Sequence, residues 1–422
     1  MVVEVSSLLE NVLEVLKRGV EQGGFTEELY TLLSKPERVV CISIPIRMDS
    51  GELRVFEGFR VQHCSALGPY KGGIRFHPKS SLEDTIALAT IMTLKNSLAG
   101  IPYGGGKGAI RVDPSKLSKS ELERLSRGYV RMLCNVLGEE LDVPGPDVGT
   151  NPQVMAWMVD EYGKIAGKSA PRVFTGKPPA LWGDPLRDYS TGYGCAVITK
   201  LIAEKVLGSL EDASIAVQGF GNVGSWHAYW VQKMGAKVVA VSDIDGTVYD
   251  PSGIDVELAM KCVRENGTVI SYPRGQKIND PKAVLYLDVD IIAPDAVENQ
   301  ITIDNAGSVK AKLIVEGANG PTTPEAERVL YSRGKLVVPD LLANSGGVIG
   351  SYIEWVQGVT WYWWGESESR RKLEEIMRRS FETVYRRFED MKCEKENVTM
   401  RDAAVVTSLD RLYQAIKVRG WL

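Results

Sequence analysis

The amino-acid sequence predicts an α/β protein with more than one domain, and three observations support this fold class. The 422 residues exceed the size of a usual domain, which is about 100–200 residues. From about residue 190, short runs rich in valine and isoleucine alternate with helical stretches, the order of a βαβ fold with a mostly parallel sheet. The character of the sequence changes near Pro178-Pro179, where we place the boundary between the two halves.

The N-terminal half predicts a helix, a hairpin and a second helix. Residues 7–20 carry an apolar stripe at helical spacing, formed by Leu9, Val12, Leu13, Leu16 and Val20. Val39 to Ile46 and Leu53 to Gln62 have the pattern of strands, and Asp49-Ser50-Gly51 between them is a turn sequence. The next helix starts at Ser80 and Ser81, which precede Glu83 and Asp84, and runs toward Ser97. Gly100 and Pro102 end it.

The C-terminal half predicts a parallel sheet followed by helices. The expected strands are Ser214 to Gln218, Lys237 to Ser242, Val289 to Ile292, Leu313 to Glu316 and Lys335 to Val338. After Ala343 the pattern becomes helical, with an apolar stripe at Leu373, Ile376, Met377, Val384, Tyr385 and Phe388. A last helix is expected from Arg401 to Val418.

Composition and charge argue against several classes of protein. The net charge of −4 provides no strong field for a nucleic acid. The N-terminus, from Met1 to Glu10, lacks the basic region of a signal peptide, and no run reaches the roughly 18 apolar residues of a membrane span. Six scattered cysteines and three histidines form no metal-binding spacing. We therefore expect a soluble cytoplasmic protein with no bound metal and no contact with membrane or nucleic acid.

A glycine-rich turn in the C-terminal half predicts a dinucleotide site. Gly219-Phe220-Gly221-Asn222-Val223-Gly224 follows the strand that ends at Gln218 and opens a helix, whose N-terminal N–H groups favour phosphate. Asp243 ends the next strand, where a carboxylate accepts hydrogen bonds from ribose hydroxyls and repels a 2′-phosphate. We therefore expect NAD in preference to NADP. A glycine turn in a βαβ unit that binds nothing is the alternative.

Three lysines in the N-terminal half lie among glycines or apolar residues. They are Lys71, Lys95 and Lys107. A buried ammonium is costly unless an anion pairs with it, so these lysines indicate an anionic substrate. Lys107 follows three glycines, but the segment lacks the residues of a phosphate-binding loop. The glycines instead suit close approach of a small substrate, and burial would make Lys107 a neutral base. The alternative for the lysines is that their side chains reach solvent. Asp147, which follows Pro144-Gly145-Pro146, is a further candidate, and its alternative is an ordinary turn residue.

The motifs together identify a family. Gly-Pro-Tyr-Lys-Gly-Gly-Ile-Arg-Phe-His-Pro, Leu-Lys-Asn-Ser, Gly-Gly-Gly-Lys-Gly, Thr-Gly-Tyr-Gly and Asn-Ser-Gly-Gly-Val all occur in this chain. From about residue 40 to its end, the sequence resembles the hexameric glutamate dehydrogenases of the Glu/Leu/Phe/Val amino-acid dehydrogenase superfamily. The resemblance implies two domains around a cleft. Residues 1–185 with the C-terminal helices 345–422 would bind substrate and mediate assembly, and residues 186–344 would form a Rossmann-like dinucleotide-binding domain.

The resemblance also implies roles for individual residues. Lys107 corresponds to the catalytic lysine and Asp147 to its partner. The implied substrate-binding residues are Lys71 and Ser351 at the side-chain carboxylate, Lys95 at the α-carboxylate, Gly145 at the amino group, and Val348 as an apolar wall. Met92 stands where many bacterial relatives carry a glutamine. The implied cofactor contacts are Thr191, Asn222, Asn319 and the turn from Gln218 to Gly224.

The implied reaction is the reversible oxidative deamination of L-glutamate to 2-oxoglutarate and ammonium, with hydride transfer to NAD or NADP. The implied assembly is a homohexamer. Lys71 favours a dicarboxylic substrate, because relatives that act on leucine or phenylalanine have an apolar residue there. Two alternatives stay open: a leucine- or valine-type dehydrogenase, and a dinucleotide-binding regulatory protein without catalysis.

Overall fold

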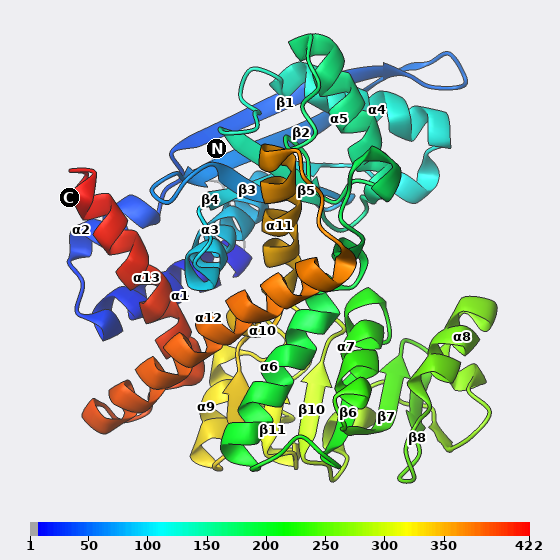
Figure 1. Cartoon of the computed structure of the whole chain (residues 1–422), viewed down its shortest axis with the longest axis vertical. Coiled ribbons are helices and arrows are strands. Elements are labelled where there is room, and N and C mark those ends of the chain that lie inside the picture. The colour runs from blue at the N-terminus through cyan, green and yellow to red at the C-terminus, as the bar shows by residue number, and fades with distance from the viewer. Residues whose placement is uncertain (1–6) are drawn as a thin grey trace. The chain divides into compact units, whose positions relative to one another are not determined.

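The computed structural model describes residues 7–422, so the first part of the N-terminal segment interpreted above lies outside the described residues. The chain forms two compact units (Figure 1). Unit 1 comprises residues up to Arg187 together with Gly350–Ser369 and Val405–Leu422, and unit 2 comprises Asp188–Ile349 and Arg370–Ala404. The sequence placed all of 345–422 with the first half. In the structure residues 370–404 belong to unit 2 instead, because their apolar stripe packs there.

Unit 1 contains a five-stranded sheet with the order β1-β2-β4-β3-β5. Its strands are β1 (Arg38–Arg47), β2 (Leu53–Cys64), β3 (Tyr70–Phe76), β4 (Gly104–Ile110) and β5 (Asp142–Pro146). β1 and β2 pair antiparallel, which confirms the predicted hairpin. β3 runs parallel to both β4 and β5. The prolines Pro144 and Pro146 are typical of a loop, and they are tolerated in this strand because β5 is at the edge of the sheet.

Helices cover this sheet, and they begin and end with local signals in the sequence. The helices assigned wholly to unit 1 are α1 (Ser7–Gly23), α2 (Glu27–Leu33), α3 (Leu82–Ala99), α4 (Lys119–Leu133) and α5 (Pro152–Ala166). The predicted start of α3 is confirmed, because the Ser81 side chain accepts a hydrogen bond from the Asp84 N–H at 3.1 Å. Its predicted end is confirmed too, since Gly100 adopts a left-handed conformation at φ 66°.

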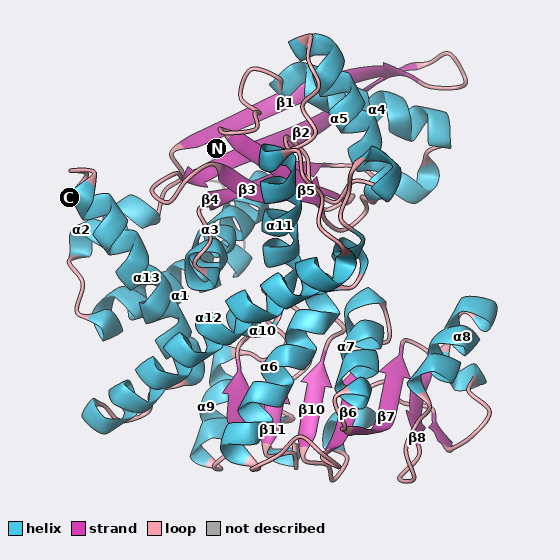
Figure 2. Ribbon diagram, in the orientation of Figure 1, coloured by secondary structure: helices cyan, strands magenta, loops and turns pink. Residues whose placement is uncertain are grey.

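Unit 2 contains a seven-stranded sheet with the order β12-β11-β10-β6-β7-β8-β9 (Figure 2). Its strands are β6 (Ser214–Gln218), β7 (Lys237–Asp243), β8 (Gly246–Tyr249), β9 (Gln276–Ile278), β10 (Ile291–Pro294), β11 (Leu313–Val315) and β12 (Leu336–Val338). The five predicted strands are present and parallel. The sequence missed β8 and β9, a short antiparallel extension at the edge.

The helices of unit 2 include α6 (Ser190–Val206) and α7 (Asn222–Lys233), which pack together in front of the sheet in Figure 1. The others are α8 (Val256–Asn266), α9 (Pro324–Ser332) and α10 (Asp340–Ala343). Three helices contain a point where the chain passes between units: α11 (Gly346–Thr360), α12 (Glu366–Glu394) and α13 (Met400–Val418). Short 3₁₀ helices occupy Pro114–Lys116, Pro179–Leu181, Pro185–Asp188, Val269–Ser271, Ala283–Tyr286 and Ala306–Ser308.

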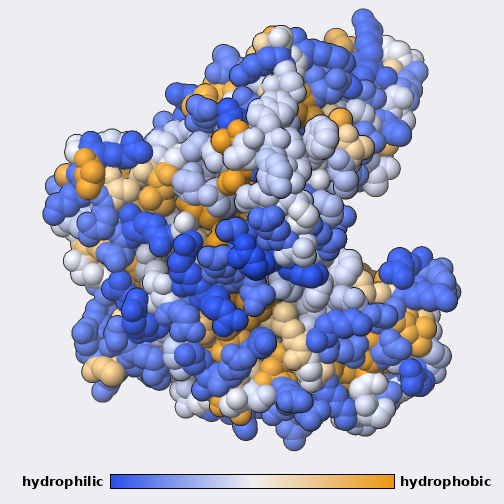
Figure 3. Space-filling view, in the orientation of Figure 1, coloured by the Kyte–Doolittle hydropathy of each residue, from blue (hydrophilic) through white to orange (hydrophobic). Residues whose placement is uncertain are grey.

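The helix α12 shows the predicted division into an apolar and a charged side. Its buried apolar residues are Leu373, Met377, Phe381, Val384, Phe388 and Met391. The opposite side is charged, and a hydrophilic band lies where α12 crosses the view in Figure 3. Among residues 7–422, no helix combines the length and the apolar character needed to cross a membrane.

Candidate active site

Strand β3 places two cations on one side of the unit 1 sheet. Lys71 and Arg75 are four residues apart on β3, and side chains alternate along a strand, so both point to the same face. The parallel neighbours β4 and β5 bring Gly105 and Val143 opposite Lys71, and Gly145 opposite Gly73. This register brings the segments that contain Lys71, Lys107 and Gly145 together on neighbouring strands.

Lys107 and Asp147 form an ion pair in this cluster. Lys107 Nζ lies 2.6 Å from Asp147 Oδ1, and Arg75 Nε lies 2.8 Å from Asp147 Oδ2. Lys107 is 5% exposed. Burial lowers the pKa of Lys107 below its usual value; the Asp147 charge opposes this shift, and the Arg75 charge adds to it. Lys107 therefore takes its neutral amine form at a lower pH than a lysine in water does.

Asp147 is held as a carboxylate by the same contacts. Burial acts to raise the pKa of Asp147, but the charges of Lys107 and Arg75 outweigh it, and the pKa lies below the usual range. A carboxylate with so low a pKa is a weak proton acceptor. This favours Asp147 as the anionic partner of Lys107 over a role in which Asp147 itself accepts and passes on protons.

Lys71 is a buried cation without a counter-ion in the described part of the chain. It is 2% exposed, and its Nζ forms no hydrogen bond or ion pair there. Burial, followed by the charges of Arg187 and Arg60, lowers the pKa of Lys71 well below its usual value. Arg60 itself is neutralised by Asp142 in a fully buried pair, whose carboxylate also accepts from Gln62 at 2.8 Å. Lys71 is thus buried with no pairing anion among residues 7–422.

Glycine at position 145 leaves room for the Lys71 ammonium. A Cβ added at Gly145 would lie 3.0 Å from Lys71 Nζ and 3.0 Å from Thr175 Oγ1. Any larger side chain there would push against both groups. Gly145 therefore lies beside Lys71, while its predicted contact with a substrate amino group stays a prediction.

Helix α3 carries the two other predicted substrate residues. Met92 and Lys95 are three residues apart, so they share a face of the helix. Met92 Cγ lies 3.2 Å from where a Cβ at Gly72 would stand, which puts it against β3 next to Lys71. Lys95 is 8% exposed despite its charge, so it does not reach freely into solvent.

Helix α11 carries Val348, Ser351 and Glu354. Ser351 and Glu354 belong to unit 1 and are nearly fully buried. Glu354 pairs with Lys177 and accepts from the Gly176 N–H at 2.8 Å, and its charge partly offsets the fall in the Lys71 pKa. Because Ser351 is one helical turn before Glu354, it lies on the same face of α11. Val348 belongs to unit 2.

The sequence interpretation missed two arginines and misjudged the role of three glycines. Arg75 lies in the Gly-Pro-Tyr-Lys-Gly-Gly-Ile-Arg-Phe-His-Pro motif, four residues after Lys71. In a strand this spacing puts both side chains on the same face, and this was the signal that could have identified Arg75. No comparable signal pointed to Arg187. Gly104, Gly105 and Gly106 were expected to allow close approach of a small substrate. In the structure an added Cβ would lie 2.0 Å from Cys64 O at Gly104, 2.0 Å from Thr93 Oγ1 at Gly105 and 3.2 Å from Tyr70 Cβ at Gly106. These glycines allow close packing of protein on β4.

The glycine-rich turn of unit 2 has the geometry that a dinucleotide pyrophosphate requires. Gly219 has φ 88°, and a Cβ on Gly224 would lie 1.9 Å from Gly219 O, so helix α7 packs tightly on β6. A Cβ on Gly221 would meet nothing within 4 Å, so this backbone is open to a ligand at the start of α7. The residues present therefore fit the cofactor that the motif predicts.

The other predicted cofactor residues surround this turn or lie on neighbouring loops. Asn222 Nδ2 donates to Asp188 O at 2.8 Å, and Gln218 Nε2 donates to Gln300 Oε1 at 2.9 Å. Phe220 is buried, Val223 is half-buried on α7, and Thr191 lies near the start of α6. Asn319 is exposed, and its Oδ1 accepts from Asn344 Nδ2 at 3.0 Å.

Asp243 ends β7 as predicted, but its carboxylate is already hydrogen-bonded. Oδ2 accepts from the Val269 N–H at 2.6 Å, and Oδ1 accepts from the Asp245 N–H at 2.9 Å and from Thr268 Oγ1 at 3.2 Å. The carboxylate therefore also holds the 268–269 segment, a role that the sequence did not indicate.

Comparison with known proteins places the chain in a family. The family model described as Glutamate/Leucine/Phenylalanine/Valine dehydrogenase matches residues 183–420, more than half of the chain. The chain belongs to this family. The family's dimerisation domain matches residues 36–164, the region that contains the sheet of unit 1.

Relatives within the family match over nearly the whole chain. The NADP(+)-dependent glutamate dehydrogenase of Pyrobaculum calidifontis is 58% identical over 98% of each chain. The NAD-specific glutamate dehydrogenase of Clostridioides difficile is 45% identical over 96% of each chain. Among solved structures, the hetero-hexameric glutamate dehydrogenase of Thermus thermophilus in a leucine-bound form has a TM-score of 0.93 and 38% identity, and covers 99% of this chain and 98% of its own.

Proposed function

We propose that this protein is an NAD(P)-dependent glutamate dehydrogenase. It converts L-glutamate, water and the oxidised cofactor to 2-oxoglutarate, ammonium, the reduced cofactor and a proton, and it also runs in reverse. The support is membership of the family, the names of relatives at 58% and 45% identity, and the cluster of lysines in unit 1.

One observation carries the choice of a dicarboxylic substrate. Lys71 is buried with the charges of Arg187 and Arg60 acting on it, and it has no ion-pair partner within the described residues. A substrate carboxylate bound at Lys71 would supply the missing anion, whereas an apolar side chain would leave the cation buried and unpaired. Ser351 is proposed to add a hydroxyl donor, and Lys95 to bind the α-carboxylate.

The chemistry is divided between the cofactor and the protein. Held at the turn from Gln218 to Gly224, the nicotinamide cofactor supplies the acceptor for the hydride that leaves the substrate Cα. Neutral Lys107 then removes a proton from a water molecule as that water attacks the iminium carbon. The ionised Asp147 holds the resulting ammonium form of Lys107 by the contact that already joins them. The ammonium group of Lys107 then returns its proton to the carbinolamine nitrogen. The C–N bond breaks, the departing ammonia takes up the proton of the carbinolamine hydroxyl, and 2-oxoglutarate and ammonium remain.

The preference between NAD and NADP rests on the charge of Asp243. A carboxylate at the end of β7 repels a 2′-phosphate even while it accepts hydrogen bonds from the protein, so we keep the prediction that NAD is preferred. Relatives named for each cofactor occur, so a single acid does not decide the matter. The ratio of kcat/KM for the two cofactors with glutamate is the direct measurement.

We further propose a homohexamer in the cytoplasm. The dimerisation domain and the hexameric structural relative support the assembly, and light scattering should give a mass six times that of the 46.4 kDa chain. No disulfide joins the six cysteines, which supports a reducing compartment.

The test is a panel of amino acids assayed with both cofactors, on the wild type and on Lys71→Met. We expect turnover of glutamate well above leucine and valine, and a fall of at least about a hundredfold in kcat/KM for glutamate in Lys71→Met, since a buried charge-assisted contact contributes roughly 3 kcal/mol. Lys79→Met, an exposed lysine near β3, is the matched control. Equal turnover of leucine would support the leucine-type alternative; cofactor binding without any turnover would support a regulatory protein.

A further inference from the structure

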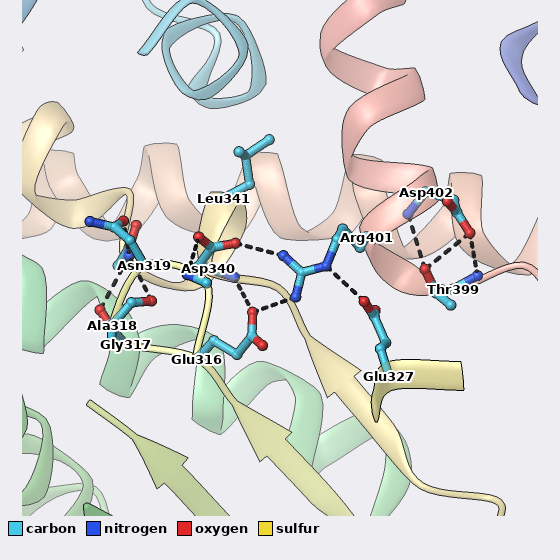
Figure 4. A network of polar contacts seen from close by, with 12 residues as sticks. Glu316, Gly317, Ala318, Asn319, Glu327, Asp340, Leu341, Thr399, Arg401 and Asp402 are labelled. Atoms are coloured by element: carbon cyan, nitrogen blue, oxygen red, sulfur yellow. Dashed lines mark hydrogen bonds and ion pairs between the residues drawn. The ribbon is translucent and has the colours of Figure 1, made fainter. Parts of the chain in front are cut away.

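Arg401 joins three carboxylates from three separate elements of unit 2 (Figure 4). It lies in the first turn of α13. Its Nη2 is 2.7 Å from Glu316 Oε2, its Nε is 2.7 Å from Glu327 Oε2, and its Nη1 is 2.8 Å from Asp340 Oδ1. Glu316 follows β11, Glu327 lies on α9 and Asp340 begins α10. All five donors of a guanidinium lie in one plane, which lets one side chain hold three acceptors.

The charges of this cluster do not balance. One arginine faces three acids, and Glu316 is fully buried. Within the described residues, Glu316 Oε1 and Glu327 Oε1 accept no hydrogen bond. Burial, then the charges of Asp340 and Glu327 acting against that of Arg401, raises the pKa of Glu316 to about 7. Burial and the neighbouring acids thus favour the protonated form of Glu316.

The same carboxylates hold both ends of one loop, residues 316–320, which we call the Asn319 loop. Glu316 Oε2 accepts from the Asp340 N–H at 2.9 Å, and Asp340 Oδ2 accepts from the Gly320 N–H at 3.0 Å. Asn344 then donates from Nδ2 to Gly317 O at 3.2 Å and to Asn319 Oδ1 at 3.0 Å. In Figure 4 the loop and Arg401 lie on opposite sides of Asp340. The loop is thus fixed through Asp340 and Glu316, which Arg401 holds in turn.

We propose that Arg401 is a positioning residue for the nicotinamide cofactor, acting through Glu316 and Asp340 to fix the Asn319 loop. The proposal rests on the proposed function, in which Asn319 is one of the cofactor contacts that the family resemblance implies. Arg401 itself touches neither cofactor nor substrate. Arg401 lies about 80 positions after the Asn319 loop in the sequence. By fixing that loop, it affects the affinity for the cofactor.

The first test compares Arg401→Lys and Arg401→Met with the wild type in the full-length protein. The measurements are the dissociation constant for the reduced cofactor from its fluorescence, the KM values for cofactor and glutamate, and the melting temperature. We expect Arg401→Met to weaken cofactor binding by about tenfold or more, equivalent to about 1.4 kcal/mol, with the glutamate KM changed less than about twofold. Arg401→Lys should restore part of the affinity, because a lysine keeps the charge but not the three-way geometry.

The matched control is Arg378→Met, which removes an exposed Arg–Glu pair on α12 in the same unit. It should leave cofactor affinity unchanged. A lower melting temperature in Arg401→Met with unchanged cofactor affinity would overturn the proposal and leave Arg401 a purely structural residue. If Arg401→Met does not fold, the dissociation constants of the reduced cofactor for Arg401→Lys and Glu316→Gln decide the question.

The second test uses Glu316→Gln and the pH dependence of cofactor binding. The charged groups that face Glu316 are Arg401, Glu327 and Asp340, from α13, α9 and α10. As pH rises through about 7, Glu316 loses its proton and repels Asp340 and Glu327, so wild-type affinity should fall. Glutamine keeps an acceptor for Arg401 and for the Asp340 N–H but does not titrate, so its affinity should vary less over this range.

Identical pH profiles for the wild type and Glu316→Gln would overturn the role of this proton. Because both tests read cofactor binding, they do not require turnover of glutamate. A wild type that binds cofactor but leaves glutamate unchanged would refute the proposed function while the Arg401 test still gives its answer.

Discussion

The charges around Lys107 show how single residues set the chemistry of the candidate site. Lys107 and Arg75 are two cations that share one carboxylate, Asp147, at 2.6 and 2.8 Å. Burial penalises every charge in the cluster, and Arg75 adds a like charge beside Lys107. Arg75 therefore favours the neutral amine on Lys107 and the ionised form of Asp147.

At this scale we predict that Arg75→Gln moves the acid limb of kcat/KM for glutamate to higher pH. Without the Arg75 charge the pKa of Lys107 rises, so at a given acidic or neutral pH less of it is the neutral base and the rate falls. A rise of one pH unit would reduce the rate on that limb about tenfold. The measurement is kcat/KM against pH, with Arg124→Gln, which breaks an exposed pair with Asp49, as control. A shift to lower pH would contradict this account.

At the scale of elements, the packing of α3 on β4 positions two of the lysines. Lys107 lies on β4 and Lys95 on α3, and the two elements approach so closely that only glycine fits at position 105. A Cβ there would lie 2.0 Å from Thr93 Oγ1 and 2.5 Å from the Thr93 backbone nitrogen. Because one of these atoms belongs to the backbone of the helix, the clash cannot be relieved by a side-chain rotation alone.

We therefore expect Gly105→Ala to destabilise the protein by about 1–3 kcal/mol, the usual cost of overpacking a core. It should also raise the KM for glutamate, because α3 carries Met92 and Lys95. Gly365→Ala, where an added Cβ meets nothing within 4 Å, is the control in the same unit. Thermal unfolding of the three proteins checks the prediction; an unchanged melting temperature for Gly105→Ala would show that α3 can move at little cost.

At the scale of the whole molecule, the chain passes repeatedly between the two units. It leaves unit 1 after Arg187, returns at Gly350, leaves again after Ser369 and returns once more at Val405. Each unit therefore depends on a segment from the last quarter of the chain. Unit 2 obtains the part of α12 that carries its six buried apolar residues, and Arg401, from that region.

We predict that a chain ending at Ile349 will not contain a folded unit 2. Each buried apolar side chain of α12 contributes about 1.5–3 kcal/mol, so the six together contribute about 9–18 kcal/mol, comparable to the roughly 5–15 kcal/mol by which a domain is stable. The truncated chain should show no cooperative thermal transition by circular dichroism and no binding of the reduced cofactor. A cooperative transition at a temperature near that of the full-length protein would show that α12 is dispensable.

Much of the fold follows from local patterns in the sequence. The hairpin of β1 and β2, the caps of α3 and the parallel strands from β6 to β12 were predictable because turn residues, capping side chains and periodicity act over a few residues. The edge strand β5 was not, because its prolines indicate a loop unless the neighbouring strand is known. The extension formed by β8 and β9 was also missed, since strands of three or four residues give too short a pattern.

The sequence by itself determined the residue types of the candidate site: lysines among glycines, an aspartate after a Pro-Gly segment, and a glycine-rich turn between strand and helix. Only the tertiary structure decided their partners. It placed Arg75 on Asp147, left Lys71 without a counter-ion within the described residues, tied Asp243 to residues 268–269, and joined Arg401 to the Asn319 loop. The physical reason is the distance along the chain over which each effect acts. Helix and strand propensities and helix caps act within a few residues. Charge pairing and burial depend on segments that are distant in the sequence and meet only in the folded chain.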